Sequence, residues 1–188
     1  MAYPISKLWA YPLFGILVRK INDIGNIPDK TKFIIVANHE KLIDPLYIIY
    51  TILKKLNKKV HFLSTGNWWF LGDVICRQWA GCIPVFNSEQ AYKEARDYIK
   101  SGKIVGIFPE GGTKRTKNPK TGAVRLALDT KTSILPIGIK SSYIPFNSTI
   151  TIGKPIYLNK NKNIEEQTLD LMRRVYNLRN SKDKKTSS

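Results

Sequence analysis

The chain of 188 residues is strongly basic, because 31 Lys and Arg residues against 14 Asp and Glu residues give a formal charge of +17 at pH 7. This charge attracts polyanions such as nucleic acid, an anionic membrane surface or an acidic carrier, although part of it can simply be solvated surface. Two cysteines and two histidines are too few for a disulfide framework or a zinc-type ligand cluster, which excludes disulfide-stabilised and zinc-binding proteins of those types. So few cysteines are typical of a protein in a reducing compartment.

The chain begins with an apolar run at residues 8–18 that contains Trp9 and Tyr11 and is followed by Arg19 and Lys20. The run is shorter than the roughly 20 apolar residues that span a bilayer, and its flanks do not fit a signal peptide. Its composition predicts that residues 1–30 form an amphipathic segment in the headgroup region of a membrane. A helix packed on the protein's own core is the alternative.

A β-branched run at residues 33–37 predicts a buried strand, which stops at Asn38-His39. His39 therefore lies at the carboxyl end of a strand, where ligand crevices form in open α/β sheets. Asp44-Pro45 is typical of a helix start, and we expect the Asp44 oxygen to cap this helix. The short loop also allows Asp44 to orient the His39 imidazole, so the pair could activate a substrate hydroxyl; a purely structural Asp-Pro and a satisfied histidine are the alternative.

The middle of the chain alternates further strands and helices. We expect strands at 60–63 and 81–86, and a helix at 88–100 that ends at Ser101-Gly102. His61 lies between apolar residues and is predicted to be structural. The aromatic stretch at 67–79, which includes Trp68, Trp69 and Phe70, can be core or an exposed ridge that contacts lipid or an acyl chain.

A buried strand at 103–108 runs into the second candidate loop, which carries a carboxylate, two glycines, a hydroxyl and cations. Glycines allow backbone N–H groups to approach an oxyanion closely, and neighbouring Lys and Arg side chains bind phosphate. The loop is not a Walker loop, because that motif's spacing is absent. A turn with solvated charges is the alternative.

The rest of the chain predicts a helix from Gly122, strands at 133–139 and 148–153, a helix at 164–179 and a disordered basic tail at 180–188. The alternation predicts an α/β fold, with a single domain at 31–179 whose central sheet is mostly parallel and flanked by helices.

Together, the motifs Asn38-His39-x4-Asp44 and Phe108-Pro109-Glu110-Gly111 resemble those of the 1-acyl-glycerol-3-phosphate acyltransferase family, which includes the glycerol-phosphate acyltransferases. Residues 81–85, 120–123 and 135–139 are similar to further blocks of the family, so the resemblance covers residues 33–156. It implies a glycerol-phosphate acyltransferase-like fold without cofactor or metal.

The resemblance implies transfer of an acyl group from acyl-CoA or acyl carrier protein to the hydroxyl of a lysophospholipid acceptor, 1-acyl-glycerol-3-phosphate, which gives phosphatidate. By motif match, His39 is the general base and Asp44 orients it. No Ser or Cys lies in a nucleophile-elbow context, so direct transfer without an acyl-enzyme is expected. The substrate-binding candidates of the second loop are Glu110, Gly111, Gly112, Thr113, Lys114, Arg115 and Lys120.

Asn87 stands where the family usually has an Arg that contacts the acceptor phosphate. An amide lacks the charge and the bidentate fork of a guanidinium, so another cation binds the phosphate or the acceptor differs, for example glycerol-3-phosphate or another lysolipid. A basic nucleic-acid-binding module is a remote alternative, but no reader motif accompanies the charge. We expect a peripheral protein at the cytoplasmic face of the cell membrane, bound to its anionic surface.

Overall fold

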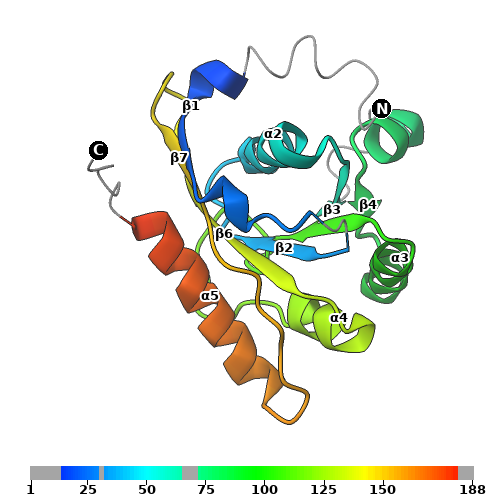
Figure 1. Ribbon diagram of the computed structural model, residues 1–188. Helices are drawn as coiled ribbons and strands as arrows, with labels where there is room; N and C mark the ends of the chain where they lie inside the picture. Colours follow the sequence, from blue (N-terminus) through cyan, green and yellow to red (C-terminus); the bar gives the residue numbers. More distant parts are fainter. Residues whose placement is uncertain (1–13, 30–31, 65–71, 182–188) are drawn as a thin grey trace.

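The computed structural model describes residues 14–29, 32–64 and 72–181 and forms a seven-stranded sheet with helices on both faces (Figure 1). The strands follow the order β1-β7-β6-β2-β5-β3-β4 across the sheet. The strands are β1 (Val18–Asn22), β2 (Ile34–Ala37), β3 (Val60–Ser64), β4 (Ile83–Pro84), β5 (Ile104–Ile107), β6 (Ile134–Lys140) and β7 (Ser148–Ile152). The helical elements are η1 (Ile24–Asn26), α2 (Asp44–Leu56), η3 (Val74–Trp79), α3 (Ser88–Lys100), α4 (Gly122–Thr130) and α5 (Ile164–Asn180).

The sheet is mostly parallel. Strand β2 pairs in parallel with β5 and β6, and β3 pairs in parallel with β5 and β4. Strand β7 returns antiparallel to β6, and β1 pairs with β7 at the edge. The predicted α/β fold with a mostly parallel sheet and flanking helices is therefore confirmed.

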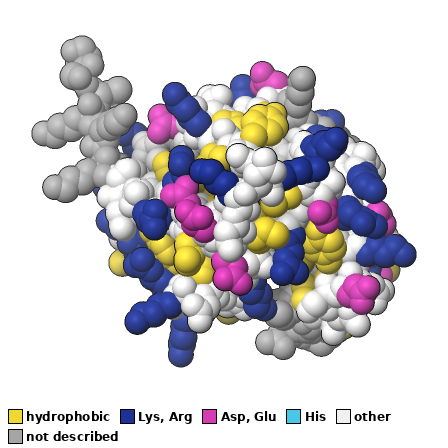
Figure 2. Space-filling view, turned by 90° about the horizontal axis from the view of Figure 1, so that it is seen from below, with side chains coloured by type: hydrophobic (Ala, Val, Ile, Leu, Met, Phe, Trp, Pro, Cys, Tyr) yellow, Lys and Arg dark blue, Asp and Glu magenta, His cyan; other side chains and the backbone are white. Residues whose placement is uncertain are grey.

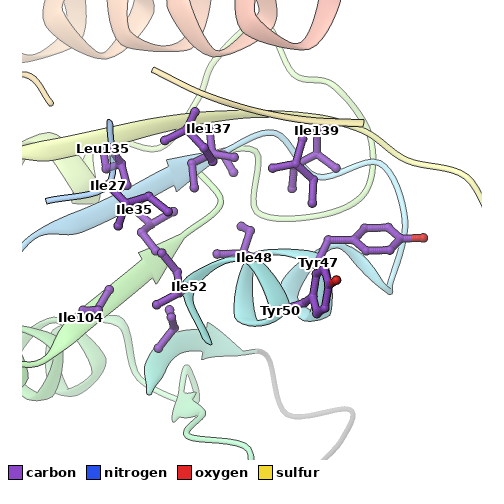
Figure 3. Close-up of a cluster of buried hydrophobic side chains, with 14 of the residues drawn as sticks. Ile27, Ile35, Tyr47, Ile48, Tyr50, Ile52, Ile104, Leu135, Ile137 and Ile139 are labelled. Atoms are coloured by element: carbon purple, nitrogen blue, oxygen red, sulfur yellow. The ribbon is translucent and has the colours of Figure 1, made fainter. Parts of the chain in front are cut away.

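Both faces of the sheet are covered, which explains why its strands are nearly continuous apolar runs. In β2, Ile35 belongs to the cluster on the α2 face, whereas Ile34 and Val36 belong to the cluster beneath α3, α4 and α5. Figure 3 shows Ile48 and Ile52 of α2 beside the strand residues of the first cluster. The central strands are therefore fixed from both sides, and their carboxyl ends provide a rigid edge.

Strand β1 lies within the stretch expected to form an N-terminal interfacial segment. Its residues pair with β7, with Lys20 opposite Thr149, so the sheet already includes Val18. The sequence analysis did not anticipate this strand, since Val18–Asn22 shows no clear alternation.

Two stretches considered for membrane contact lie outside the described residues. They are residues 1–13, which include most of the apolar run 8–18, and the Trp68-Trp69-Phe70 cluster. Within the described ranges, no helix is both long and apolar enough to span a bilayer.

Helix α5 packs closely on β6 because Gly138 has no side chain. A Cβ atom at Gly138 would lie 2.2 Å from the backbone nitrogen of Arg179, a distance that no real contact allows. This close approach brings the last turns of α5 to the carboxyl end of β2. The candidate site is formed there.

Candidate active site

His39 and Asp44 meet at the carboxyl end of β2, as the motif predicts. The Nδ1 atom of His39 lies 3.1 Å from Oδ2 of Asp44. The Asp44 side chain is fully buried, whereas 15% of the His39 side chain is exposed. An imidazole held at Nδ1 by a buried carboxylate keeps its Nε2 atom for a substrate, which is the arrangement of a histidine general base.

The Asp44 carboxylate is held by donors from two loops. Its Oδ2 atom also accepts from the backbone N–H groups of Glu40, at 2.6 Å, and Lys41, at 2.9 Å. Its Oδ1 atom accepts from the hydroxyl of Ser141 at the end of β6. The expectation that Asp44 caps its helix is wrong: Ile43 is the N-cap residue, Asp44 is the first helical residue, and no side-chain cap bond forms. The carboxylate instead turns back toward the His39 loop.

Asn38 fixes the start of that loop. Its amide donates to the carbonyl of Ile139 and its oxygen accepts from the N–H of Ile139, both at 2.8 Å. The side chain is fully buried, and this pair of bonds extends the contact between β2 and β6 beyond the end of β2. Asn38 therefore sets the position at which His39 leaves the sheet.

Glu110 lies beside His39, so the structure brings the two motifs together. Its Oε2 atom accepts from the backbone N–H of His39 at 2.5 Å, and its Oε1 atom accepts from the hydroxyl of Tyr176. Burial raises the pKa of the Glu110 carboxyl above its usual value, while these two hydrogen bonds oppose the shift. Glu110 thus connects the β5 loop to both the His39 loop and α5.

Helix α5 supplies residues that the sequence analysis missed. Besides Tyr176, Arg179 forms an ion pair with Glu40, next to His39. The guanidinium of Arg115 lies over the Tyr176 ring, 4.0 Å from its centroid, which is within cation–π range. The amphipathic pattern of 164–179 indicates a helix but not which polar residues reach a distant loop. Ser141 was also missed, although its place after a strand end is a usable signal.

The remaining candidates of the second loop divide into two groups. Lys120 lies against the loop. Its backbone N–H donates to the carbonyl of Pro109 at 2.8 Å, and a Cβ atom added to Gly111 would lie 3.0 Å from the Nζ atom of Lys120. Gly111 also has a φ of +69°, which a glycine adopts without strain. Gly112, Thr113 and Lys114 are exposed, as Arg115 and Lys120 are, but among the described residues they show no contact like that of Arg115 with Tyr176 or of Lys120 with Gly111.

Aromatic rings form one wall of the site. Phe108, at the start of the Glu-Gly loop, stacks on the His39 ring with centroids 4.4 Å apart, and Phe62 stacks on Phe108 at 5.4 Å. A ring on its face limits how the imidazole can turn and excludes water from that side. The wall therefore reinforces the orientation that Asp44 imposes.

Asn87, the residue that replaces the family's Arg, caps a helix. Its side-chain oxygen accepts from the N–H groups of Glu89 and Gln90 at the start of α3. It satisfies two free N–H groups of that helix, which is the usual role of an N-cap asparagine.

Within the described ranges, no group of three or more His, Cys, Asp or Glu side chains gathers that could hold a metal ion.

His61 is placed differently from His39. Its Nδ1 atom lies 3.1 Å from the carbonyl of Gly81, and its ring contacts Tyr98. Burial, together with Lys103 and Lys59, lowers the pKa of His61 to about 4. The ring is therefore neutral near pH 7 and hydrogen-bonded to the backbone, which agrees with the structural role predicted for it.

Comparisons with known proteins identify the family of this chain. The family model described as Acyltransferase matches residues 18–140. A relative, the 1-acyl-sn-glycerol-3-phosphate acyltransferase of Borreliella burgdorferi, is 28% identical over 146 residues, which cover 71% of this chain. The match spans only 56% of that relative. The crystal structure of the 1-acyl-sn-glycerophosphate acyltransferase PlsC from Thermotoga maritima superposes with a TM-score of 0.68 at 21% identity, covering 96% of this chain and 79% of that one. These matches confirm the resemblance drawn from the motifs, and the chain belongs to the Acyltransferase family.

Proposed function

We propose that this protein transfers a fatty acyl group from an acyl thioester, acyl-CoA or acyl carrier protein, to the free hydroxyl of 1-acyl-glycerol-3-phosphate, which gives phosphatidate. The observation that carries the proposal is the His39–Asp44 pair, 3.1 Å apart, with Glu110 bound to the backbone of His39. The relative from Borreliella burgdorferi, named for this activity, supports the choice of acceptor.

In the proposed reaction His39 Nε2 takes the proton of the acceptor hydroxyl as its oxygen attacks the thioester carbonyl carbon. The new C–O bond forms and the C–S bond breaks, and the proton on His39 then passes to the departing thiolate. Asp44 stabilises the imidazolium that exists between these two transfers, because its charge faces Nδ1. The net products are the ester and the free thiol, and no group on the protein is acylated.

The acceptor phosphate is proposed to bind cations of the Glu-Gly loop. Arg115 and Lys120 are the strongest candidates, since Tyr176 supports the first and Gly111 contacts the second. A guanidinium offers paired donors to a phosphate, and an ammonium adds a point charge. Glu110 contributes to this role indirectly, because both of its oxygens already accept hydrogen bonds within the protein.

A different acceptor, glycerol-3-phosphate or another lysolipid, is the second candidate. The observation in its favour is Asn87, whose side-chain oxygen serves α3 and which offers no positive charge to a phosphate. An acceptor panel separates the two candidates by the mass of the product.

The place of action that we propose is the cytoplasmic face of the cell membrane, with the protein bound peripherally. The formal charge of +17 supports attraction to an anionic leaflet. A lysolipid with a long acyl chain is presented at such a surface, so an enzyme that uses it gains by residing there.

Product analysis by mass spectrometry over a matrix of acyl donors and acceptors tests the proposal. We expect phosphatidate from lysophosphatidate, and a loss of about 10² to 10⁴ in turnover for His39→Ala. The matched control is His61→Gln, which changes the other histidine and is expected to keep its activity. Full turnover by folded His39→Ala would reject the assigned base, and absence of product with every phosphorylated acceptor would reject the acceptor class.

A further inference from the structure

We infer that the loop between β6 and β7, residues 141–147, is a lipid-contact element that docks this domain on an anionic bilayer. From the sequence, membrane contact is predicted for residues 8–18 and is one of two alternatives for the aromatic stretch at 67–79, and no such role is predicted for this loop. The inference adds to the proposed function by naming the surface that faces the lipid. Its consequence for catalysis rests on that proposed function.

The loop exposes three large apolar side chains within four residues. Tyr143, Ile144 and Phe146 are 59%, 65% and 63% exposed. Leu42, in the turn between His39 and Asp44, is 65% exposed as well. Lys41 of that turn reaches the Tyr143 ring, so the two exposed segments adjoin each other. Clustered exposed apolar side chains mark an interaction surface, whereas single ones do not.

The fold holds this loop in a defined shape. The hydroxyl of Tyr47 donates to the carbonyl of Ser142 at 2.6 Å, and the N–H of Phe146 donates to the carbonyl of Ile16 at 2.7 Å. Phe146 has a φ of +54°, a left-handed conformation that is costly for a residue with a bulky side chain. The molecule therefore accepts backbone strain while it displays an aromatic ring to solvent.

The charges around the loop favour an anionic lipid surface. The Lys41 ammonium lies 4.7 Å from the centroid of Tyr143, and exposed Lys140 directly precedes the loop. The two acidic side chains of the adjoining turn are already engaged, since Glu40 pairs with Arg179 and Asp44 is buried. The sequence from 141 to 154 contains no acidic residue. Apolar side chains among unopposed cations match the composition of interfacial segments.

A bilayer fits this surface better than a second copy of the chain. A stable interface between proteins buries roughly 800 Å² on each partner, and one short loop with its neighbours offers little toward that area. Two copies would also bring together cations of like sign, because each chain carries +17.

The loop is joined directly to the candidate active site. Ser141, its first residue, donates to Asp44, the partner of His39. Docking through this loop therefore places the His39 turn at the lipid surface, where the hydroxyl of a lysolipid lies. The opposite end of the sheet lies where Ile156 pairs with Ile134, the first residue of β6. Its surface charges differ from those around the loop. Figure 2 shows that the face toward α4 and the start of α5 carries acidic side chains scattered among the basic ones.

Vesicle co-sedimentation of the full chain tests the inference. The test variant is Ile144→Ser with Phe146→Asn, in which asparagine tolerates the positive φ. The matched control is Tyr157→Ser with Leu169→Ser, two exposed apolar residues that line a hollow at the opposite end. On vesicles of phosphatidylcholine with phosphatidylglycerol, we expect the test variant to bind at least about tenfold more weakly than wild type. The control variant is expected to bind like wild type.

Binding of the test variant that equals wild type overturns the inference. So does a change from dimer to monomer in sedimentation equilibrium without vesicles, since the surface then joins two copies. If the double variant does not fold, Ile144→Ser alone gives the same comparison. The binding assay needs no turnover, so it stands even if the proposed activity fails. If acyl transfer is found, the variant should lose turnover on vesicle-borne acceptor and keep it on a soluble short-chain acceptor.

Discussion

The replacement of Asp44 by Asn separates the charge of this residue from its shape. Oδ2 faces three donors, the Nδ1 of His39 and the N–H groups of Glu40 and Lys41, whereas Oδ1 faces only the hydroxyl of Ser141. The asparagine oxygen therefore takes the Oδ2 position, and its NH₂ group faces Ser141, whose hydroxyl can turn to accept. The variant keeps its hydrogen bonds and loses one negative charge.

The loss of that charge is expected to affect catalysis more than folding. Two unit charges about 4 Å apart interact by about 4 kcal/mol at an effective dielectric constant near 20. The imidazolium loses this stabilisation, so turnover should fall by two to three orders of magnitude. Two backbone hydrogen bonds weaken from charged to neutral type, at about 1 kcal/mol each, so the free energy of unfolding should fall by about 2 kcal/mol.

The assay compares acyl transfer with urea unfolding for Asp44→Asn and for Ser141→Ala. The second variant also removes a hydrogen bond to the carboxylate, but it leaves the charge in front of His39. It should lose less than tenfold in turnover at a similar cost in stability. The reasoning is refuted if folded Asp44→Asn stays within tenfold of wild type, or if Ser141→Ala loses as much activity as Asp44→Asn.

Of three further predictions, two concern the support of the site and one concerns the structural histidine, His61. Tyr176→Phe removes the donor to Glu110 but keeps the ring beneath Arg115, so the acceptor KM should rise roughly tenfold in steady-state kinetics. Tyr176→Leu also removes the ring and should raise the KM further. Gly138→Ala forces α5 off β6 and should lower the free energy of unfolding by about 1–3 kcal/mol or more in urea, with loss of activity; wild-type stability would contradict the close packing. Because the pKa of His61 is lowered to about 4 in the folded state, this histidine becomes protonated below about pH 6.5 in the unfolded state but only near pH 4 in the folded state. The free energy of unfolding of wild type should therefore fall by about 3 kcal/mol from pH 6.5 to pH 4 relative to that of His61→Gln. Parallel pH profiles of the two proteins in urea unfolding would show that His61 does not cause the loss.

The sequence alone predicted most of the sheet and both loops of the candidate site. The run before Asn38 is a strand because β-branched residues fit a sheet that is buried on both faces, and His39 consequently follows a strand end. The helix α3 (Ser88–Lys100) was predicted from Ser88 to about Lys100, since its start and the Ser101-Gly102 stop are local signals. The turn at Gly111 has the same origin, because a glycine marks it.

Other features depended on which segments lie side by side in the fold. Strand β1 forms because β7 offers it an edge, and nothing within Val18–Asn22 indicates that partner. Asp44 was expected to cap α2, but it meets donors from its own loop and from Ser141, which is 97 residues away in the chain. Asn87 was noted as a departure from the family, and only the structure shows it as the cap of α3.

The chain's own order of residues thus determined the strands, the helices and the two motifs, because hydrophobic periodicity and turn chemistry act between near neighbours. The tertiary structure decided which polar groups meet: the strand order places β6 beside β2, and the missing side chain of Gly138 sets how closely α5 approaches. Ser141, Tyr176 and Arg179 join the His39 site for that reason. Contacts between residues so far apart depend on the packing of whole elements, which no local pattern contains.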